Sequence, residues 1–111
     1  MTKYEKKLKG DFEEILEFCH NTVMNKSMPS SFEGGSDYSV YGVRIAVRVY
    51  ERYSAFGGNR VSLNLTLIGS GEDLFLSAIA SGGSQALIWK VNTYSEESFL
   101  STLVESLKKY T

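Results

Sequence analysis

The amino-acid sequence predicts an α+β fold: a two-layer sandwich in which an antiparallel four- to five-stranded meander has the N- and C-terminal helices on one face. Three observations predict it. Glycine clusters at 34–35, 57–58, 69–71 and 82–83 separate runs that alternate polar and apolar residues, as strands do. No long helical pattern interrupts these runs, so hairpins would join consecutive strands. At the two ends of the chain, apolar residues instead recur with helical spacing.

The N-terminal helix is expected to begin at Asp11, which with Glu14 forms a capping pair. Pro29 limits this helix, because the residue before a proline is pushed away from α geometry. The basic segment 1–9 has too few apolar residues to anchor a membrane, and we expect it to be a frayed lead-in to the helix. The predicted apolar stripe of the helix consists of Phe12, Ile15, Leu16, Cys19 and Val23.

Five segments read as strands, at 31–38, 41–54, 60–68, 72–80 and 85–92. In the second of these the valine and isoleucine side of the alternation is assigned to the core, and the arginine side to solvent. We prefer the register that pairs Arg52 with Ser62, because pairing Arg52 with Arg60 would place like charges opposite each other.

The stretch SGGSQALIWK raises the question of whether Gly82 and Gly83 hold a phosphate or turn the chain. Phosphate-binding glycine loops lead from a strand into a helix, whereas a strand pattern follows here. We therefore predict a hairpin turn, which pairs Ala78 with Leu87.

The C-terminal helix is predicted from an N-cap at Ser95, from acidic residues after it and from lysines at its far end. Its apolar stripe consists of Phe99, Leu100, Leu103, Val104 and Leu107.

Length and composition indicate one domain over residues 1–111, with 42% hydrophobic and 23% charged residues. A net charge of −1 argues against nucleic acid as the main partner. There is neither a secretory signal pattern nor a run of about 20 apolar residues, so we expect a cytoplasmic protein. One cysteine allows no internal disulfide, and we expect no metal site and no cofactor.

Catalytic chemistry has little support in the sequence. Cys19 and His20 are adjacent on a helix, so their side chains point about 100° apart and do not form a nucleophile–base pair. The acidic residues of the first helical turns are explained by capping and by the helix dipole. We lean against an enzyme.

The second face of the sheet is predicted to be apolar at one side. An exposed contiguous apolar surface usually marks an interface, and a two-fold dimer is the commonest way to cover one. The candidate interface residues are Ile68, Phe75, Ile79 and Ile88.

The other side of that face is expected to carry cationic and hydrogen-bonding groups. Such groups beside an apolar floor suit a small anionic ligand. The candidate ligand-binding residues are Arg44, Arg48, Tyr50, Arg52 and Asn64.

The pieces VYERYS, GGNRVSLN and AIASGGSQ, followed by a Phe-Leu helix, resemble a family of small bacterial proteins, domain-of-unknown-function family 6054. The resemblance implies a compact α+β protein and transfers no activity. The leading hypothesis is a non-enzymatic interaction module that forms a homodimer through the second sheet face. The alternative is a small anionic ligand-binding protein, and an enzyme ranks third.

Overall fold

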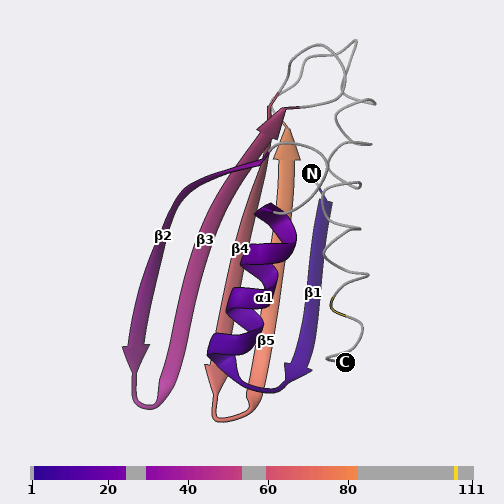
Figure 1. The fold of residues 1–111 in the computed structure, drawn as a ribbon. Coiled ribbons are helices and arrows are strands. Elements are labelled where there is room, and N and C mark those ends of the chain that lie inside the picture. Colours follow the sequence, from indigo (N-terminus) through magenta and orange to yellow (C-terminus); the bar gives the residue numbers. More distant parts are fainter. Residues whose placement is uncertain (1, 25–29, 54–59, 83–106, 108–111) are drawn as a thin grey trace.

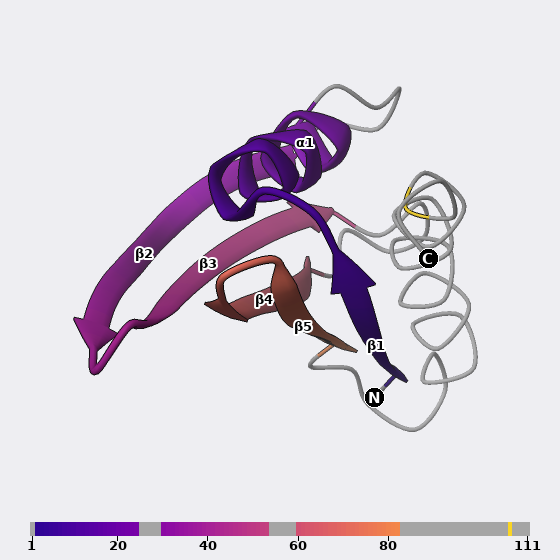
Figure 2. The same ribbon diagram turned by 90° about the horizontal axis from the view of Figure 1, so that it is seen from below.

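The computed structural model describes residues 2–24, 30–53, 60–82 and 107. In this part of the chain, one antiparallel sheet of five strands, in the order β1-β5-β4-β3-β2, carries a helix on one face (Figures 1 and 2). The antiparallel sheet predicted from the sequence is confirmed. The elements in chain order are β1 (Thr2–Lys9), α1 (Phe12–Met24), β2 (Ser30–Val40), β3 (Val43–Tyr53), β4 (Arg60–Ser70) and β5 (Asp73–Gly82).

Strands β2 to β5 form the predicted meander, but the edge beside β5 is occupied by β1. The expectation of a frayed segment over residues 1–9 is wrong, because Thr2–Lys9 pairs with β5 along its whole length. The predicted pairing of Ala78 with Leu87 is also wrong, because Ala78 pairs with Leu65 on one side and with Tyr4 on the other. The predicted strand 85–92 lies outside the described residues.

Helix α1 crosses one face of the sheet and links the two edge strands β1 and β2 (Figure 1). Its start is capped as predicted: the Asp11 carboxylate accepts a hydrogen bond of 3.0 Å from the backbone N–H of Glu14. All five residues of the predicted apolar stripe are buried.

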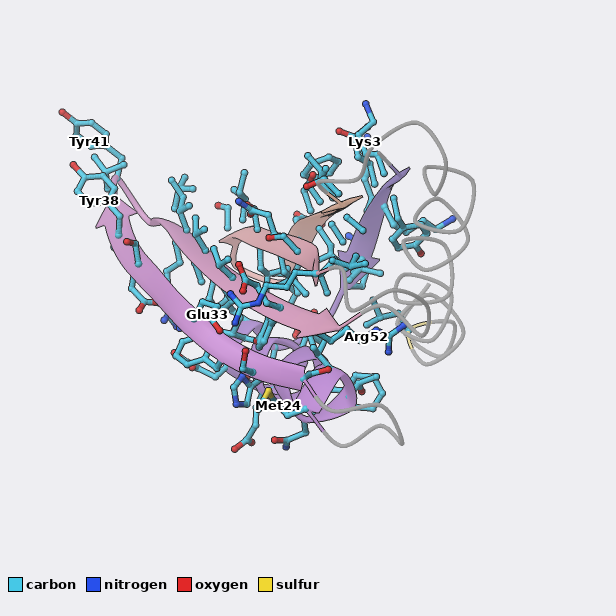
Figure 3. All side chains as sticks on the ribbon, turned by 90° about the horizontal axis from the view of Figure 1, so that it is seen from above. Lys3, Met24, Glu33, Tyr38, Tyr41 and Arg52 are labelled. Carbon is cyan, nitrogen blue, oxygen red and sulfur yellow. The ribbon has the colours of Figure 1, made fainter. Side chains whose placement is uncertain are left out.

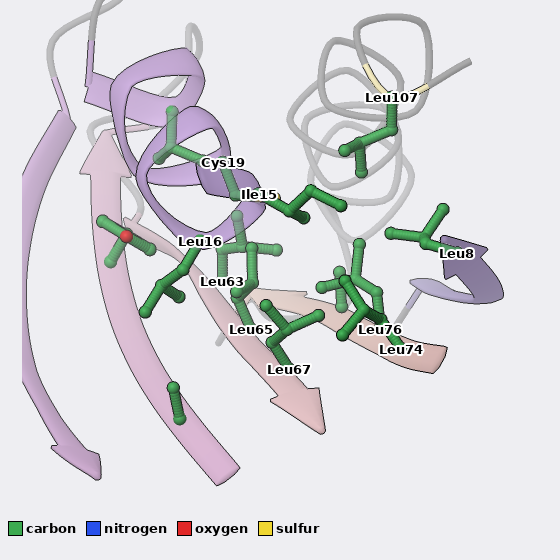
Figure 4. Close-up of a cluster of buried hydrophobic side chains, with 14 of the residues drawn as sticks. Leu8, Ile15, Leu16, Cys19, Leu63, Leu65, Leu67, Leu74, Leu76 and Leu107 are labelled. Atoms are coloured by element: carbon green, nitrogen blue, oxygen red, sulfur yellow. The ribbon is translucent and has the colours of Figure 1, made fainter. Parts of the chain in front are cut away.

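The predicted pair of terminal helices is not borne out, since α1 is the one helix among the elements assigned in the described ranges. The C-terminal helix predicted from Ser95 lies outside the described residues, except for Leu107. Leu107 is fully buried in the core, on the side of β5 and β1 (Figure 4).

The core lies between α1 and a continuous leucine surface on β4 and β5. Leu63, Leu65 and Leu67 of β4 are completely buried, and Figure 4 shows them beneath Ile15 and Cys19 of α1. Cross-strand pairing continues this surface onto β5, where Leu76 lies beside Leu67. Burying these side chains supplies the main stabilisation of the fold.

The face assignment predicted for β3 is wrong. The observed register pairs Arg52 with Val61 and Tyr50 with Leu63, one residue away from the predicted register. A shift of one residue exchanges the two faces of a strand. Ala46, Tyr50 and Arg52 are therefore buried on the α1 side, whereas the valines of β3 lie on the opposite face.

The β2–β3 hairpin turns at Tyr41 and Gly42, both with positive φ (52° and 76°), as a type I′ turn requires. The glycine pair 34–35 lies inside β2, next to a break in register between Phe32 and Gly34. No helix in the described ranges is long and apolar enough to span a membrane.

Gly69 of β4 allows the start of α1 to approach the sheet closely. A Cβ atom at this position would lie 2.6 Å from Leu74 Cδ2 and 2.7 Å from Phe12 Cδ2. We expect Gly69→Ala to lower the free energy of unfolding by about 1–3 kcal/mol in urea titrations. Ser70→Ala, next to it and exposed, should change stability by less than about 0.5 kcal/mol. Equal stability of both variants would contradict this packing.

Candidate functional site

The second sheet face, which is the face opposite α1, carries a contiguous apolar cluster. No described element packs on it (Figure 2). The cluster follows cross-strand pairs, such as Ile45 with Ile68 and Ile68 with Phe75. Its members, all partly exposed, are Val43, Ile45, Val47, Val49, Ile68 and Phe75. Ile79 lies on the same face but is separated from this cluster by Asn64 and Ser77.

Charged residues border this cluster at both edges of the sheet. Along β1 the outward side chains are Lys3, Glu5, Lys7 and Lys9, and Figure 3 shows Lys3 on the side of the sheet away from α1. At the β2 edge, the hydroxyl of Ser31 donates a hydrogen bond to the Glu33 carboxylate. At the β1 edge, Lys3 pairs with Glu5 at 3.8 Å and Lys9 pairs with Asp73, which leaves Lys7 as the net positive charge, whereas Glu33 is a carboxylate at the β2 edge.

A groove of about 720 Å³ lies at the end of the second face near the β4–β5 turn. Val43, Ile68 and Phe75 form its apolar floor, and Lys7 and Lys9 stand beside it. Lys9 forms an ion pair with Asp73 at 2.5 Å, which raises the pKa of Lys9 and lowers the pKa of Asp73. The side chain of Lys7, unlike those of Lys3 and Lys9, has no ion-pair or hydrogen-bond partner among the described residues.

A second hollow of about 600 Å³ lies between α1 and the β2–β3 hairpin. There, His20 Nδ1 and the hydroxyl of Tyr50 lie 2.9 Å apart. The Phe32 ring contacts both of these rings, with centroid distances of 5.5 and 5.6 Å. Burial raises the pKa of Tyr50 to about 12, and the nearby positive charge of Arg48 offsets part of this rise. Tyr50 is consequently a neutral hydrogen-bonding group at physiological pH.

The arginines on the α1 side take part in contacts within the protein. Arg44 forms an ion pair with Glu13 at 2.5 Å and lies 4.3 Å from the centre of the Phe12 ring. Arg48 reaches Asp37 at 2.9 Å across Gly35, where a Cβ atom would lie only 2.9 Å from Arg48 Cδ. Their charged ends therefore neutralise carboxylates on the margin of the core.

The predicted ligand-binding residues do not form one cluster. Arg44, Arg48, Tyr50 and Arg52 share the α1 side of β3, whereas Asn64 lies on the second face, paired with Val49 and Ile79. Arg52 is 6% exposed, and this burial lowers its pKa.

Three of the four predicted interface residues lie on the same sheet face, and two of them, Ile68 and Phe75, are direct cross-strand partners. Ile68, Phe75 and Ile79 share the second face, and Ile88 lies outside the described residues. The sequence reading missed the contribution of β3, because it assigned Val43, Ile45, Val47 and Val49 to the core. The leucines of β4 were the sequence signal that could have corrected this assignment. They form a core surface by themselves, so the valines of β3 were not needed to complete it.

Cys19 is fully buried in the core, and burial raises its pKa to about 12. A thiol in this state is protonated at neutral pH and is a poor nucleophile. Within the described residues, no group of three or more His, Cys, Asp or Glu side chains is placed to hold a metal ion.

The His20–Tyr50 contact predicts a pH-dependent stability difference. Tyr50→Phe should lower the free energy of unfolding at pH 8 by about 1 kcal/mol, because the hydrogen bond is lost. A tyrosine in an unfolded chain has a pKa of about 10, below the value of about 12 in the fold. The unfolded state therefore releases its proton first, and wild-type stability falls as the pH rises from 10 toward 12.

The difference between wild type and Tyr50→Phe should consequently narrow in urea titrations from pH 8 to pH 11. Tyr41→Phe serves as the control, since Tyr41 is 99% exposed and the change should have no effect. A difference that does not vary with pH would contradict the burial of the Tyr50 hydroxyl.

Comparison with known proteins gives one match. No curated protein and no solved structure matches the chain. A family model, described as a family of unknown function (DUF6054), matches residues 1–111. The match covers the whole five-stranded sheet and α1, and the chain is therefore a member of the DUF6054 family.

Proposed function

We propose that this protein is a non-enzymatic interaction module that forms a homodimer by packing the second faces of two copies against each other. The partly exposed apolar cluster on that face is the observation that carries the proposal. An antiparallel sheet commonly has one face on its core and a polar face toward water. A second face with six contiguous apolar side chains instead suits burial against another surface.

The size of the second face supports a partner that is itself a sheet. Five strands spaced about 4.8 Å apart, and about ten residues long at about 3.3 Å per residue, present roughly 800 Å². A standard stable interface buries about 800 Å² on each partner. Two such faces stacked together match this area without a further element.

The distribution of charge favours a two-fold axis parallel to the strands and close to the central strand β4. Such an axis places β1 of one copy opposite β2 of the other. Cross-strand pairing runs from Lys3 through Ile79, Asn64 and Val49 to Gly34, so these residues share one level of the sheet. Lys3 would then face the region of Glu33 in the second copy, and the two edges would be electrostatically complementary.

Ile79→Asp tests the dimer directly. It places a carboxylate on the proposed contact face, where the dimer would remove it from water and where the cross-strand neighbour Lys3 is the one cation in register with it. We expect the dimer dissociation constant to rise about a hundredfold or more, measured by sedimentation velocity. Asn21→Asp adds the same charge at an exposed position of α1 and should leave the dimer unchanged. A wild-type protein that is monomeric at high concentration would refute the proposal.

The orientation of the two copies has a separate test. Lys3→Glu should weaken the dimer about two- to tenfold, because it sets like charges at the facing edges. Glu33→Lys should weaken it similarly, and the double variant should recover most of the wild-type affinity. A double variant weaker than either single variant would exclude the axis parallel to the strands, while the dimer itself could persist.

A further inference from the structure

We propose that the groove near the β4–β5 turn binds one free fatty acid, with the carboxylate at Lys7 and the hydrocarbon chain along Val43, Ile68 and Phe75. The hollow of about 720 Å³ lies within the range of about 300–1,000 Å³ that small-molecule sites occupy. This inference goes beyond the proposed dimer and does not depend on it.

The charge of the groove selects the headgroup. Three charged side chains line it: Lys7, Lys9 and Asp73. Asp73 neutralises Lys9 through their 2.5 Å ion pair. Lys7 is left as the net positive charge, beside Phe75, with which it pairs across the strands. One uncompensated cation at the margin of an apolar floor matches an amphipathic ligand that carries one negative charge.

The floor of the groove selects the tail. Val43, Ile68 and Phe75 are partly exposed, and their side chains are hydrocarbon, with no hydrogen-bond donor or acceptor. A saturated chain laid on this floor removes apolar surface from water, both its own and that of the protein. A small polar anion would use Lys7 and leave the floor unused, so the groove favours a long-chain carboxylate.

The groove and the proposed dimer contact share two residues, Ile68 and Phe75. Cross-strand pairing also sets Tyr38 at the level of Ile45, Ile68, Phe75 and Lys7. In a dimer with its axis along β4, Tyr38 of the partner subunit would therefore lie over the groove. Tyr38 is 64% exposed in the single chain (Figure 3), which leaves it available for this contact. A bound fatty acid and a second copy would thus compete.

The test is calorimetric titration of the full chain with dodecanoate below its micelle concentration. It uses the wild type and the Ile79→Asp variant, in which the proposed dimer contact is disrupted. Affinity should increase from octanoate to dodecanoate, and dodecyltrimethylammonium, which has the same tail and the opposite charge, should bind more weakly.

Lys7→Gln should weaken dodecanoate binding about fivefold. Lys6→Gln is the matched control: Lys6 is also exposed on β1 but pairs with Leu76, on the α1 side of the sheet, and its loss should have no effect. No binding to Ile79→Asp, equal effects of the two lysine variants, or binding only to micelles or lipid vesicles would overturn the inference.

Comparing the affinity of dodecanoate for the wild type and for Ile79→Asp distinguishes a failure of the fatty-acid site from a failure of the proposed dimer. If the wild type is a dimer, dodecanoate should dissociate it, and the apparent affinity should be weaker than that of Ile79→Asp. If the wild type is monomeric, the two affinities should be equal and the lysine comparison still decides the site. Binding that leaves a wild-type dimer intact, with equal affinity, would show that the dimer does not cover the groove and would refute the proposed dimer face, while the comparison of Lys7→Gln with Lys6→Gln would still decide the site.

Discussion

The packing of α1 on the leucines of β4 is the contact on which the rest of the structure depends. Ile15 and Cys19 of the helix and Leu63, Leu65 and Leu67 of the strand are all excluded from water (Figure 4). Once this face of β4 is covered, the cross-strand register determines which side chains of β3 and β5 enter the core. The same register sends the valines of β3 to the second face, where they form the surface that we assign to binding.

Among the described elements, α1 alone lies on this face and Leu107 is buried towards β5 and β1, whereas the margin of the core beside β2 and β3 is polar. Long side chains such as Arg44 and Arg48 extend along the apolar surface and place their charged ends at carboxylates beyond it. On the same side of the sheet, the Tyr50 hydroxyl lies within hydrogen-bond distance of His20 Nδ1. Arg44, Arg48 and Tyr50, which the sequence suggested as ligand-binding residues, therefore make contacts within the protein on the α1 side. The second face keeps a partly exposed apolar cluster on β3, β4 and β5, and this cluster is the surface on which the proposed function rests.

Local patterns were sufficient for much of the fold and for part of the candidate site. Helical spacing and the cap at Asp11 predicted α1, and alternation predicted the strands of the meander. Alternation along β4 and β5 also placed Ile68, Phe75 and Ile79 on one face. The edge strand β1 was missed because its lysines give it no apolar alternation, and its stability comes from pairing with β5, which follows 64 or more residues later in the chain.

The sequence by itself determined which residues of each strand lie together, because side chains alternate between two faces with a period of two residues. It did not determine which of those faces is covered. In β3 both faces are plausible core faces, one with four β-branched residues and one with Ala46 and Tyr50. Only the tertiary structure decided between them, since the choice depends on the register with β4 and on the side from which α1 approaches. Both are non-local constraints, and they convert a predicted core surface into the candidate binding surface.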